Sequence, residues 1–359
     1  MMHHPETRED WLALRHKYVS STEVAALFGM SPYLTAFELA TIKKAETPDE
    51  REGTERMSWG LRLQNAIARG IAEDYGVKVR AINGYAIDSH LHCRMGASFD
   101  YEIVGAKDGE FSGPTILRDM YAKHGAGTLE IKNVDRYEFA KWTAGDEIEA
   151  PAHIEIQMQH QLACIARFWG AIGVLVGGNR AEVLVRERDH DVCKSLRAKC
   201  EAFWRDLERG TMPPVELPAD AQIIAALYRY AEPGKVLDAQ GNEEIAAICR
   251  EYHDAGRAEK MAGEAKASAK AKLLLAIGDA ERVLADGFTV SAGVTAEAEI
   301  PAYTRKAYRN IRVTAKKERT NGNKQSVHRD NDGADRRAAE GTAHSGAGQV
   351  AEGRARQGD

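Results

Sequence analysis

The sequence predicts an α/β fold with a helical extension towards the C-terminus, and three observations lead to it. A helix is expected over residues 58–75, because apolar side chains recur there at four-residue spacing: Leu63, Ile67, Ile71 and Tyr75. Short segments of alternating polarity follow, which is typical of strands, at 77–88, 97–104 and 127–134. A second helix over 151–170, opened by Pro151, and a further strand over 180–187 complete the pattern.

Composition limits the function classes. The chain has 359 residues, of which 43% are hydrophobic, so it can bury a sizeable core. Its net charge of -5 excludes a strongly basic coat, so any contact with DNA needs a local patch. Neither a signal-peptide core nor an apolar run of about 18 residues is present, so we expect no contact with a membrane.

The cysteines argue against a disulfide framework and a structural zinc site. There are five, an odd number, and none forms a CxxC pair: Cys93, Cys164, Cys193, Cys200 and Cys249. A reducing, cytoplasmic location fits this pattern best.

The N-terminal region predicts a short leader and then a helix. Residues 1–18 form the leader, and a helix is expected to start near Ser20. Ser20 and Glu23 have the spacing of a capping box, and Gly29 is a plausible end. The charged stretch 45–56 is expected to be a loop.

Beyond Pro218 the composition changes. Helices are expected over 220–230 and 241–277, and a small strand pair over 286–313. From Lys316 onwards large apolar residues almost vanish, which predicts disorder. We therefore expect a main domain, a helical arm, a small β region and a disordered tail, at 1–215, 216–285, 286–315 and 316–359.

The segment Thr128–Val134 is the most informative for chemistry. Side chains alternate along a strand, so Glu130 and Lys132 share one face while Leu129 and Ile131 can pack into a core. A carboxylate suits Mg²⁺ or Mn²⁺, and a neighbouring ammonium can orient a water or stabilise charge on phosphate. A Glu-x-Lys triplet is common by chance, however, and a solvated pair at a sheet edge remains the alternative.

Asp100 is a second candidate, about thirty residues before Glu130. In a strand it would alternate with Phe99 and Tyr101 and point away from the apolar face. A hairpin or meander would bring it next to Glu130. An ordinary exposed aspartate is the alternative.

Gln157 is a third candidate, on the helix expected over 151–170. This helix has an apolar stripe of Ile154, Met158, Ile165 and Trp169. Gln157 and Gln161 lie at the edge of the stripe, and a buried amide needs hydrogen-bond partners such as water or phosphate. The alternative is a glutamine on the helix surface.

The order of these parts resembles a PD-(D/E)XK nuclease core. A helix is followed by strands carrying Asp and then Glu-x-Lys, and by a helix carrying Gln. The resemblance implies a restriction-endonuclease-like fold, in which a mixed central sheet is flanked by helices and a metal lies at the sheet edge.

Residues 11–205 resemble, more narrowly, the YqaJ-type viral recombinases, the family of phage λ exonuclease. Five short motifs in the same order carry this resemblance: Arg15 with Val19–Val24, Trp59-Gly60, Ser98-Phe99-Asp100, Leu129–Lys132, and Ile156–Gln159.

The resemblance implies a role for each matching residue. Asp100, Glu130 and the carbonyl of Ile131 would bind Mg²⁺ or Mn²⁺, Lys132 would handle the attacking water, and Gln157 would support the site. A DNA 5′-phosphate would bind at Arg15, Ser21 and Thr22, although helix capping alone also accounts for the hydroxyl residues. Gln64 stands where the family usually has a metal-binding glutamate, and Phe99 replaces a proline.

The implied function is a metal-dependent DNA exonuclease. It would act 5′→3′ on double-stranded ends and leave 3′ single strands for phage-type recombination. The implied partners are DNA ends, a single-strand annealing recombinase and further copies of the chain, as a trimer. Two alternatives stay open: an endonuclease on the same fold, and a catalytically weakened DNA-binding scaffold for an annealing protein.

Overall fold

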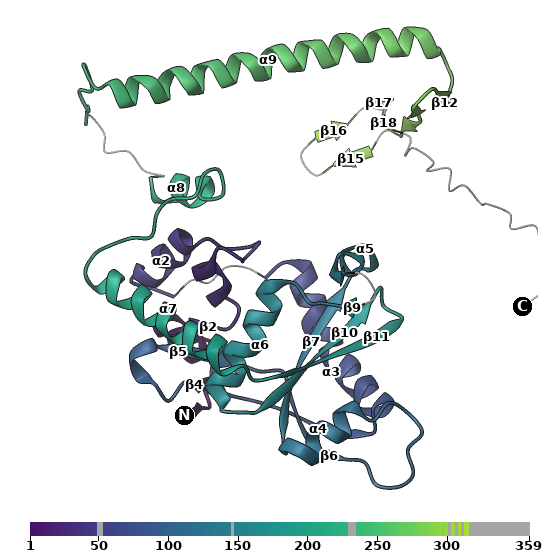
Figure 1. Ribbon diagram of the computed structural model, residues 1–359. Coiled ribbons are helices and arrows are strands. Elements are labelled where there is room, and N and C mark those ends of the chain that lie inside the picture. The colour runs from purple at the N-terminus through teal and green to yellow at the C-terminus, as the bar shows by residue number, and fades with distance from the viewer. Residues whose placement is uncertain are drawn as a thin grey trace, which may run out of the picture. The chain divides into compact units, whose positions relative to one another are not determined.

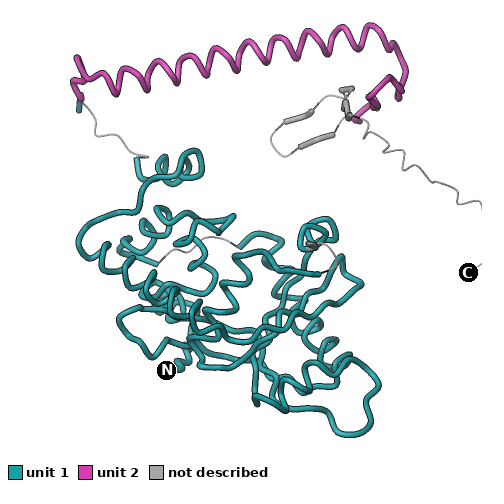
Figure 2. Tube along the Cα trace, viewed as in Figure 1, with its two compact units in different colours: residues 1–235 teal, residues 236–359 magenta. Residues whose placement is uncertain are grey.

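A computed structural model describes the chain over most of its length. The described residues are 1–48, 53–144, 147–228, 235–296, 298–300, 303–305, 308–309 and 312–315. They fall into two compact units, residues 1–235 and residues 236–359 (Figure 2). The predicted domain boundaries at 215, 285 and 315 stay predictions, because a compact unit need not be a folding domain.

A five-stranded mixed sheet organises the first unit (Figure 1). Its strands, in spatial order, are β11 (Arg180–Glu187), β10 (Trp169–Val176), β7 (Gly127–Val134), β6 (Tyr101–Ala106) and β3 (Val77–Ala81). β7 and β10 are parallel, and the other neighbouring pairs are antiparallel. The α/β prediction is confirmed at this level.

Helices cover both faces of this sheet. On one face, α3 (Glu55–Asp74) and α4 (Ile116–His124) enclose a core with Ile71, Leu129 and Ile131. On the other face, α6 (Ala152–Ile165) packs Met158 and Leu162 against β10. Short elements complete that side: α5 (Arg136–Phe139), η3 (Ala140–Trp142), β8 (Thr143–Ala144) and β9 (Glu147–Ile148).

A second, four-stranded sheet lies in the same unit. Its order is β1 (Met2–His3), β4 (Tyr85–Ile87), β5 (Met95–Ser98) and β2 (Val19–Ser20). The helices around it are α1 (Arg8–Lys17), the 3₁₀ helices η1 (Val24–Phe28) and η2 (Leu91–Cys93), α2 (Ala36–Lys44) and α7 (His190–Glu208). A third core joins β5 to α2, α6 and α7 through buried side chains such as Leu39, Met95 and Leu196.

The helix expected near Ser20 is a short 3₁₀ helix that begins only at Val24. Glu23 caps it without a side-chain hydrogen bond. Half of the expected capping box is present, because the amide of Ser20 donates to Glu23 Oε2 at 2.9 Å. Gly29 ends the helix in the left-handed region, at φ 65°, as expected.

The strand expected over 97–104 is two strands in different sheets. β5 ends at Ser98 and β6 begins at Tyr101, with Phe99 and Asp100 between them. The simple alternation therefore fails here, and Glu102 is buried beside Arg80 and Arg167. Asp100 consequently lies at the junction of the two sheets.

The helix expected over 151–170 ends five residues early. Ala166 has φ 54°, which stops α6 at Ile165. Trp169, expected on the helix stripe, begins β10 and is fully buried in the sheet core. The expectation was wrong because β10 is a continuous apolar run, buried on both faces, which has no period to distinguish it from a helix.

The remaining elements follow α7. α8 (Ala221–Leu227) closes the first unit, and α9 (Glu243–Ile277) opens the second, in agreement with the two helices expected. Among the described residues after them are seven short strands: β12 (Arg282–Ala285), β13 (Phe288–Ser291), β14 (Val294–Thr295), β15 (Ala298–Ile300), β16 (Tyr303–Arg305), β17 (Tyr308–Arg309) and β18 (Arg312–Ala315). The disorder expected over 316–359 lies outside the described residues. Within the described part, every helix is too short or too polar to cross a membrane.

Candidate active site

Glu130 and Lys132 project from β7 towards α6. Their neighbours Leu129 and Ile131 pack on the opposite face, in the core under α3. Glu130 is 7% exposed, and Lys132 Nζ lies 2.8 Å from its Oε1. The shared face expected from the two-residue spacing is therefore present, with Glu130 buried and Lys132 partly exposed.

Two glutamines of α6 hold the Glu130 carboxylate. Gln157 Nε2 donates to Oε1 at 2.6 Å, and Gln161 Nε2 donates to Oε2 at 2.8 Å. Gln157 also accepts from Lys132 Nζ at 3.0 Å. Because the two glutamines are four residues apart, they lie on one helix face, and both are buried. This arrangement fixes the orientation of Glu130 and Lys132.

Asp100 joins this group from the junction of the sheets. β6 and β7 pair Tyr101 with Leu129, so the next position along the register places Asp100 opposite Glu130. Asp100 Oδ2 accepts from the amide of Ile131 at 2.7 Å, and the side chain of Gln64 also donates to this carboxylate. The predicted residues of the central site are thus brought together.

The two carboxylates and the lysine are electrostatically linked. Burial raises the pKa of Asp100 to about 7, and the nearby charge of Glu130 adds to the rise. Burial alone would lower the pKa of Lys132, but the charge and hydrogen bond of Glu130 outweigh it, so this pKa is raised. At neutral pH Lys132 is therefore an ammonium, which donates hydrogen bonds.

Asp100 and Glu130 could supply oxygen ligands of the kind that a small divalent cation prefers. The amide of Ile131 points at Asp100, and the carbonyl of a strand residue points to the same side as its amide. Asp100, Glu130 and this carbonyl thus offer hard oxygen donors on one side of β7. No group of three or more acidic, His or Cys side chains suited to a metal occurs among the described residues. Mg²⁺ is often bound by one or two carboxylates together with water and phosphate, so two are enough.

Arg15 and Thr22 also lie together, far in the sequence from Asp100, Glu130 and Lys132. Arg15 Nη2 donates to Thr22 Oγ1 at 3.2 Å, and its Nε lies 3.3 Å from Glu23 Oε1. The buried Lys43 is paired with the same glutamate at 2.8 Å. Burial raises the pKa of Glu23, but the charges of Lys43 and Arg15 outweigh it, so the net pKa is lowered and the carboxylate form is favoured. Thr22 is exposed, whereas Ser21 is buried and is not presented to solvent.

Arg15, Thr22, Glu23 and Lys43 are called the Arg15 cluster below. Ser98 connects this cluster to Glu130. The Arg15 guanidinium lies 5.3 Å from the centre of the Trp11 ring, and Trp11 Nε1 donates to Ser98 Oγ at 2.9 Å. Gln161 Nε2 in turn donates to the carbonyl of Ser98 at 3.1 Å. Both groups of predicted residues therefore belong to one contiguous set of contacts.

Sequence reasoning missed Gln161 and Lys43 as parts of these clusters. The four-residue spacing of Gln157 and Gln161 was the available signal for the first. Nothing in the local sequence marks Lys43, whose pairing with Glu23 is tertiary. Gln159, which belongs to the expected Gln-x-Gln motif, points elsewhere and bonds the carbonyl of Glu187 and the amide of Asp189.

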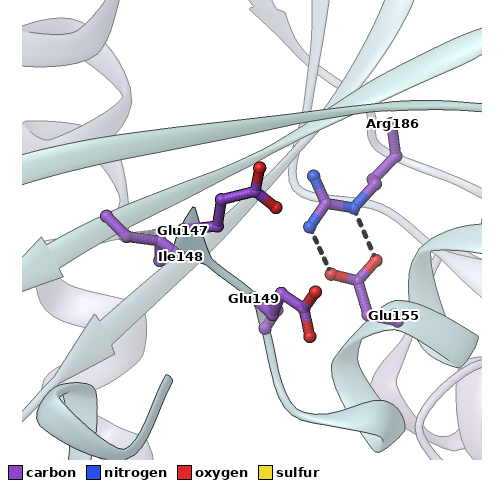
Figure 3. Close-up of a pocket in the computed structure, with 6 residues that line it drawn as sticks. Glu147, Ile148, Glu149, Glu155 and Arg186 are labelled. Atoms are coloured by element: carbon purple, nitrogen blue, oxygen red, sulfur yellow. Dashed lines mark hydrogen bonds and ion pairs between the residues drawn. The ribbon is translucent and has the colours of Figure 1, made fainter. Parts of the chain in front are cut away.

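A separate hollow in the same unit contains none of the predicted site residues. It lies between β9, α6 and β11 and is lined by Glu147, Ile148, Glu149, Ala150, Glu155 and Arg186 (Figure 3). Arg186 makes two hydrogen bonds to Glu155, at 2.6 and 2.8 Å, so this cation is neutralised. The hollow is not part of the site proposed here.

The fold and site define an α/β protein whose polar centre lies between a mixed sheet and a helix. Residues 10–167, a little under half of the chain, match the family model of the YqaJ-like viral recombinase domain.

One protein sequence and two crystal structures are also similar to this chain, at low sequence identity. The uncharacterized protein YqaJ of Bacillus subtilis (strain 168) is 25% identical over 229 residues. The alignment covers 63% of this chain and 64% of that protein, a little under two thirds of each. Crystal structures of the alkaline exonuclease LHK-Exo from Laribacter hongkongensis, alone and with dAMP, match at 19% and 18% identity. Each match covers 62% of this chain and 100% of the other, with a TM-score of 0.40, which is too low to bear on function.

Proposed function

We propose that the first unit is a PD-(D/E)XK-type deoxyribonuclease that hydrolyses phosphodiester bonds with the help of Mg²⁺ or Mn²⁺. One observation carries the proposal: Asp100, at the bend before β6, and Glu130, on the adjoining β7, come to one place beside the ammonium of Lys132. The match of residues 10–167 to the model of the viral recombinase domain supports DNA as the substrate.

Each side chain has a distinct task in this proposal. A cation held by Asp100, Glu130 and the Ile131 carbonyl would polarise the phosphate and favour ionisation of a water. Lys132 donates hydrogen bonds to the attacking water or to a phosphate oxygen, whose negative charge grows as the bond breaks. Gln157 and Gln161 keep the Glu130 carboxylate oriented when Lys132 turns to the substrate.

The Arg15 cluster supports action from a 5′ end. Arg15 and Thr22 offer a guanidinium and a hydroxyl that could bind a terminal phosphate, and Ser98 connects them to the catalytic group. We infer a 5′→3′ exonuclease on double-stranded ends, which leaves 3′ strands for an annealing recombinase. A trimeric assembly is part of the same proposal and rests on the family resemblance.

Gln64 favours a second possibility, a nuclease of reduced activity. It occupies the position of the usual family glutamate and hydrogen-bonds Asp100 as a neutral amide. A third carboxylate would add a metal ligand, so Gln64→Glu should raise the rate of cleavage or the affinity for Mg²⁺. If only Gln64→Glu cleaves DNA and the natural chain is inert, the protein is a weakened, DNA-binding member of the family.

A cleavage assay tests the main proposal. Linear duplexes with 5′-phosphate or 5′-hydroxyl ends are incubated with Mg²⁺, alongside a covalently closed circle. Lys132→Ala and Asp100→Ala should lower the rate on linear DNA by about 100-fold or more. Asp108→Ala is the control, since this aspartate is exposed and belongs to a loop after β6. An inert natural chain would refute the nuclease, and a cut circle would favour the endonuclease alternative.

The preference for a 5′-phosphate is tested on the same substrates. Arg15→Ala should abolish the difference in rate between phosphorylated and hydroxyl ends, because the Arg15 guanidinium is partly exposed whereas the neighbouring cation, Lys43, is buried. An unchanged preference would again point to an endonuclease.

A further inference from the structure

An exposed aromatic ring is held in place at the N-terminal end of α6. Tyr33, in the loop between η1 and α2, is 78% exposed. Its ring meets that of His153 edge to face, with centroids 5.7 Å apart and planes at 88°. Its amide donates to Ser31 Oγ at 3.2 Å, and the next residue, Leu34, packs against a core. The ring is thus positioned by its loop and by His153 while much of its surface faces solvent.

His153 places this pair beside the candidate active site. One row along α6 is formed by three residues at four-residue spacing: His153, Gln157 and Gln161. Gln157, one turn from His153, bonds both Glu130 and Lys132. The two rings therefore lie about one helical turn beyond the Lys132 ammonium.

The electrostatics of the rings agree with this placement. Burial lowers the pKa of His153, and the charge of Lys132 lowers it further. At neutral pH His153 is a neutral ring, so it is poorly suited to pair with a phosphate as a cation. What the pair offers to a ligand is an aromatic surface with a tyrosine hydroxyl at its edge.

We propose that Tyr33, supported by His153, is a stacking platform for the nucleobase next to the phosphate that is cleaved. The inference rests on the proposed nuclease function and names a residue that would position its substrate. Every base has a π face, so the contact would be independent of sequence. Stacking of one base on an aromatic side chain corresponds to roughly a 5- to 100-fold gain in affinity.

A fluorescent base analogue tests the platform. 2-Aminopurine is placed at the first, second or third nucleotide from the 5′ end of a duplex, with Ca²⁺ in place of Mg²⁺ to slow cleavage. With the natural chain, one of these positions should be quenched by stacking. Tyr33→Ala should remove the quenching and raise KM by about 5- to 100-fold with little change in kcat. Tyr33→Phe, which keeps the ring, should restore both.

Phe168→Ala is the matched control. Phe168 is also exposed, at 56%, and also contacts a histidine, His124, at 6.1 Å between centroids. Phe168 directly precedes β10, and Val174 of β10 pairs with Lys132 of β7. Phe168 is six residues before Val174, which corresponds to about 20 Å along the strand. Its loss should change neither the quenching nor KM.

The outcomes separate the platform from the nuclease. If DNA is cleaved and Tyr33→Ala matches the natural chain in quenching and KM, the platform is wrong and the nuclease stands. If DNA is bound without cleavage and the quenching depends on Tyr33, the base-stacking contact of Tyr33 stands, while the nuclease and the role of Tyr33 in cleavage fail. A chain that binds no DNA contradicts both.

Discussion

At the scale of single residues, the three donors around Glu130 hold the site in shape. Gln161 contributes one of them and also bonds Ser98, so its loss frees a buried carboxylate oxygen. Gln161→Leu should lower kcat/KM by about 10- to 100-fold in molecules that remain folded. Steady-state kinetics normalised to the folded fraction measures this.

Gln159 is the control on the same helix. It is also a buried glutamine with two hydrogen bonds, but these go to β11 and the start of α7. Gln159→Leu should lower Tm and leave kcat/KM per folded molecule within about 2-fold. Equal loss of activity in both variants would show that Gln161 acts only through the stability of α6.

The burial of Asp100 in the candidate active site lowers the folding stability of the chain when its carboxyl group is ionised. Its pKa is about 7 in the folded chain against 3.8 as the ordinary value. Below 3.8 the group is protonated in both states and has no effect. Between 3.8 and 7 the folded state holds the extra proton, so stability falls as pH rises, and above 7 the full cost of about 2–4 kcal/mol remains.

Asp100→Asn should therefore stabilise the metal-free chain while abolishing cleavage. In EDTA at pH 8, Tm should rise by several degrees, and the gain should disappear near pH 4. Thermal unfolding at both pH values measures this. A lower Tm at pH 8 would mean that the carboxylate stabilises the fold and that the burial argument fails.

Sequence reasoning found the central residues and one support, Gln157, but not the others. The spacing of Glu130 and Lys132 on one strand fixes a shared face, and this needs no knowledge of the rest of the fold. Asp100 was placed near them by a hairpin assumption, although it lies at a bend rather than within a strand. The roles of all three remain predictions. Gln161 and Lys43 depend on packing between distant segments, which local patterns do not encode.

At the scale of elements, segments with a clear hydrophobic period were predicted well. The continuous apolar run that forms β10 was not. α3, β7 and β11 show clear helical or alternating patterns and occur close to the expected positions. β10 lacks a period because both its faces are buried, so it was absorbed into the preceding helix. The end of α6 at Ala166 was missed because alanine gives no stop signal.

Ala166 offers a test of that helix end. Its φ of 54° is unfavourable for any residue with a Cβ atom, and glycine is the usual residue there. Ala166→Gly should stabilise the chain by about 0.5–1 kcal/mol. Ala163→Gly, at a buried position in the last turn of the same helix, should destabilise it by about 0.5–1 kcal/mol. Denaturant unfolding compares the two, and a loss in both would contradict a left-handed end at Ala166.

At the scale of the whole molecule, the first unit contains the three cores and every predicted site residue. α9 buries none of its residues. Removing residues 236–359 should therefore leave the Tm of the first unit within about 2 °C. A thermal scan of the shortened chain measures this, and a large fall would mean that the second unit supports the fold.

The central claim is that Asp100 and Glu130 share one divalent cation beside Lys132. Crystals grown at pH 8, above the pKa of about 7 for Asp100, and soaked in Mn²⁺ test it through anomalous scattering. We expect one strong peak within about 2.5 Å of an oxygen from each carboxylate, and its loss in Asp100→Asn. A peak held by only one of them, or none, would contradict it.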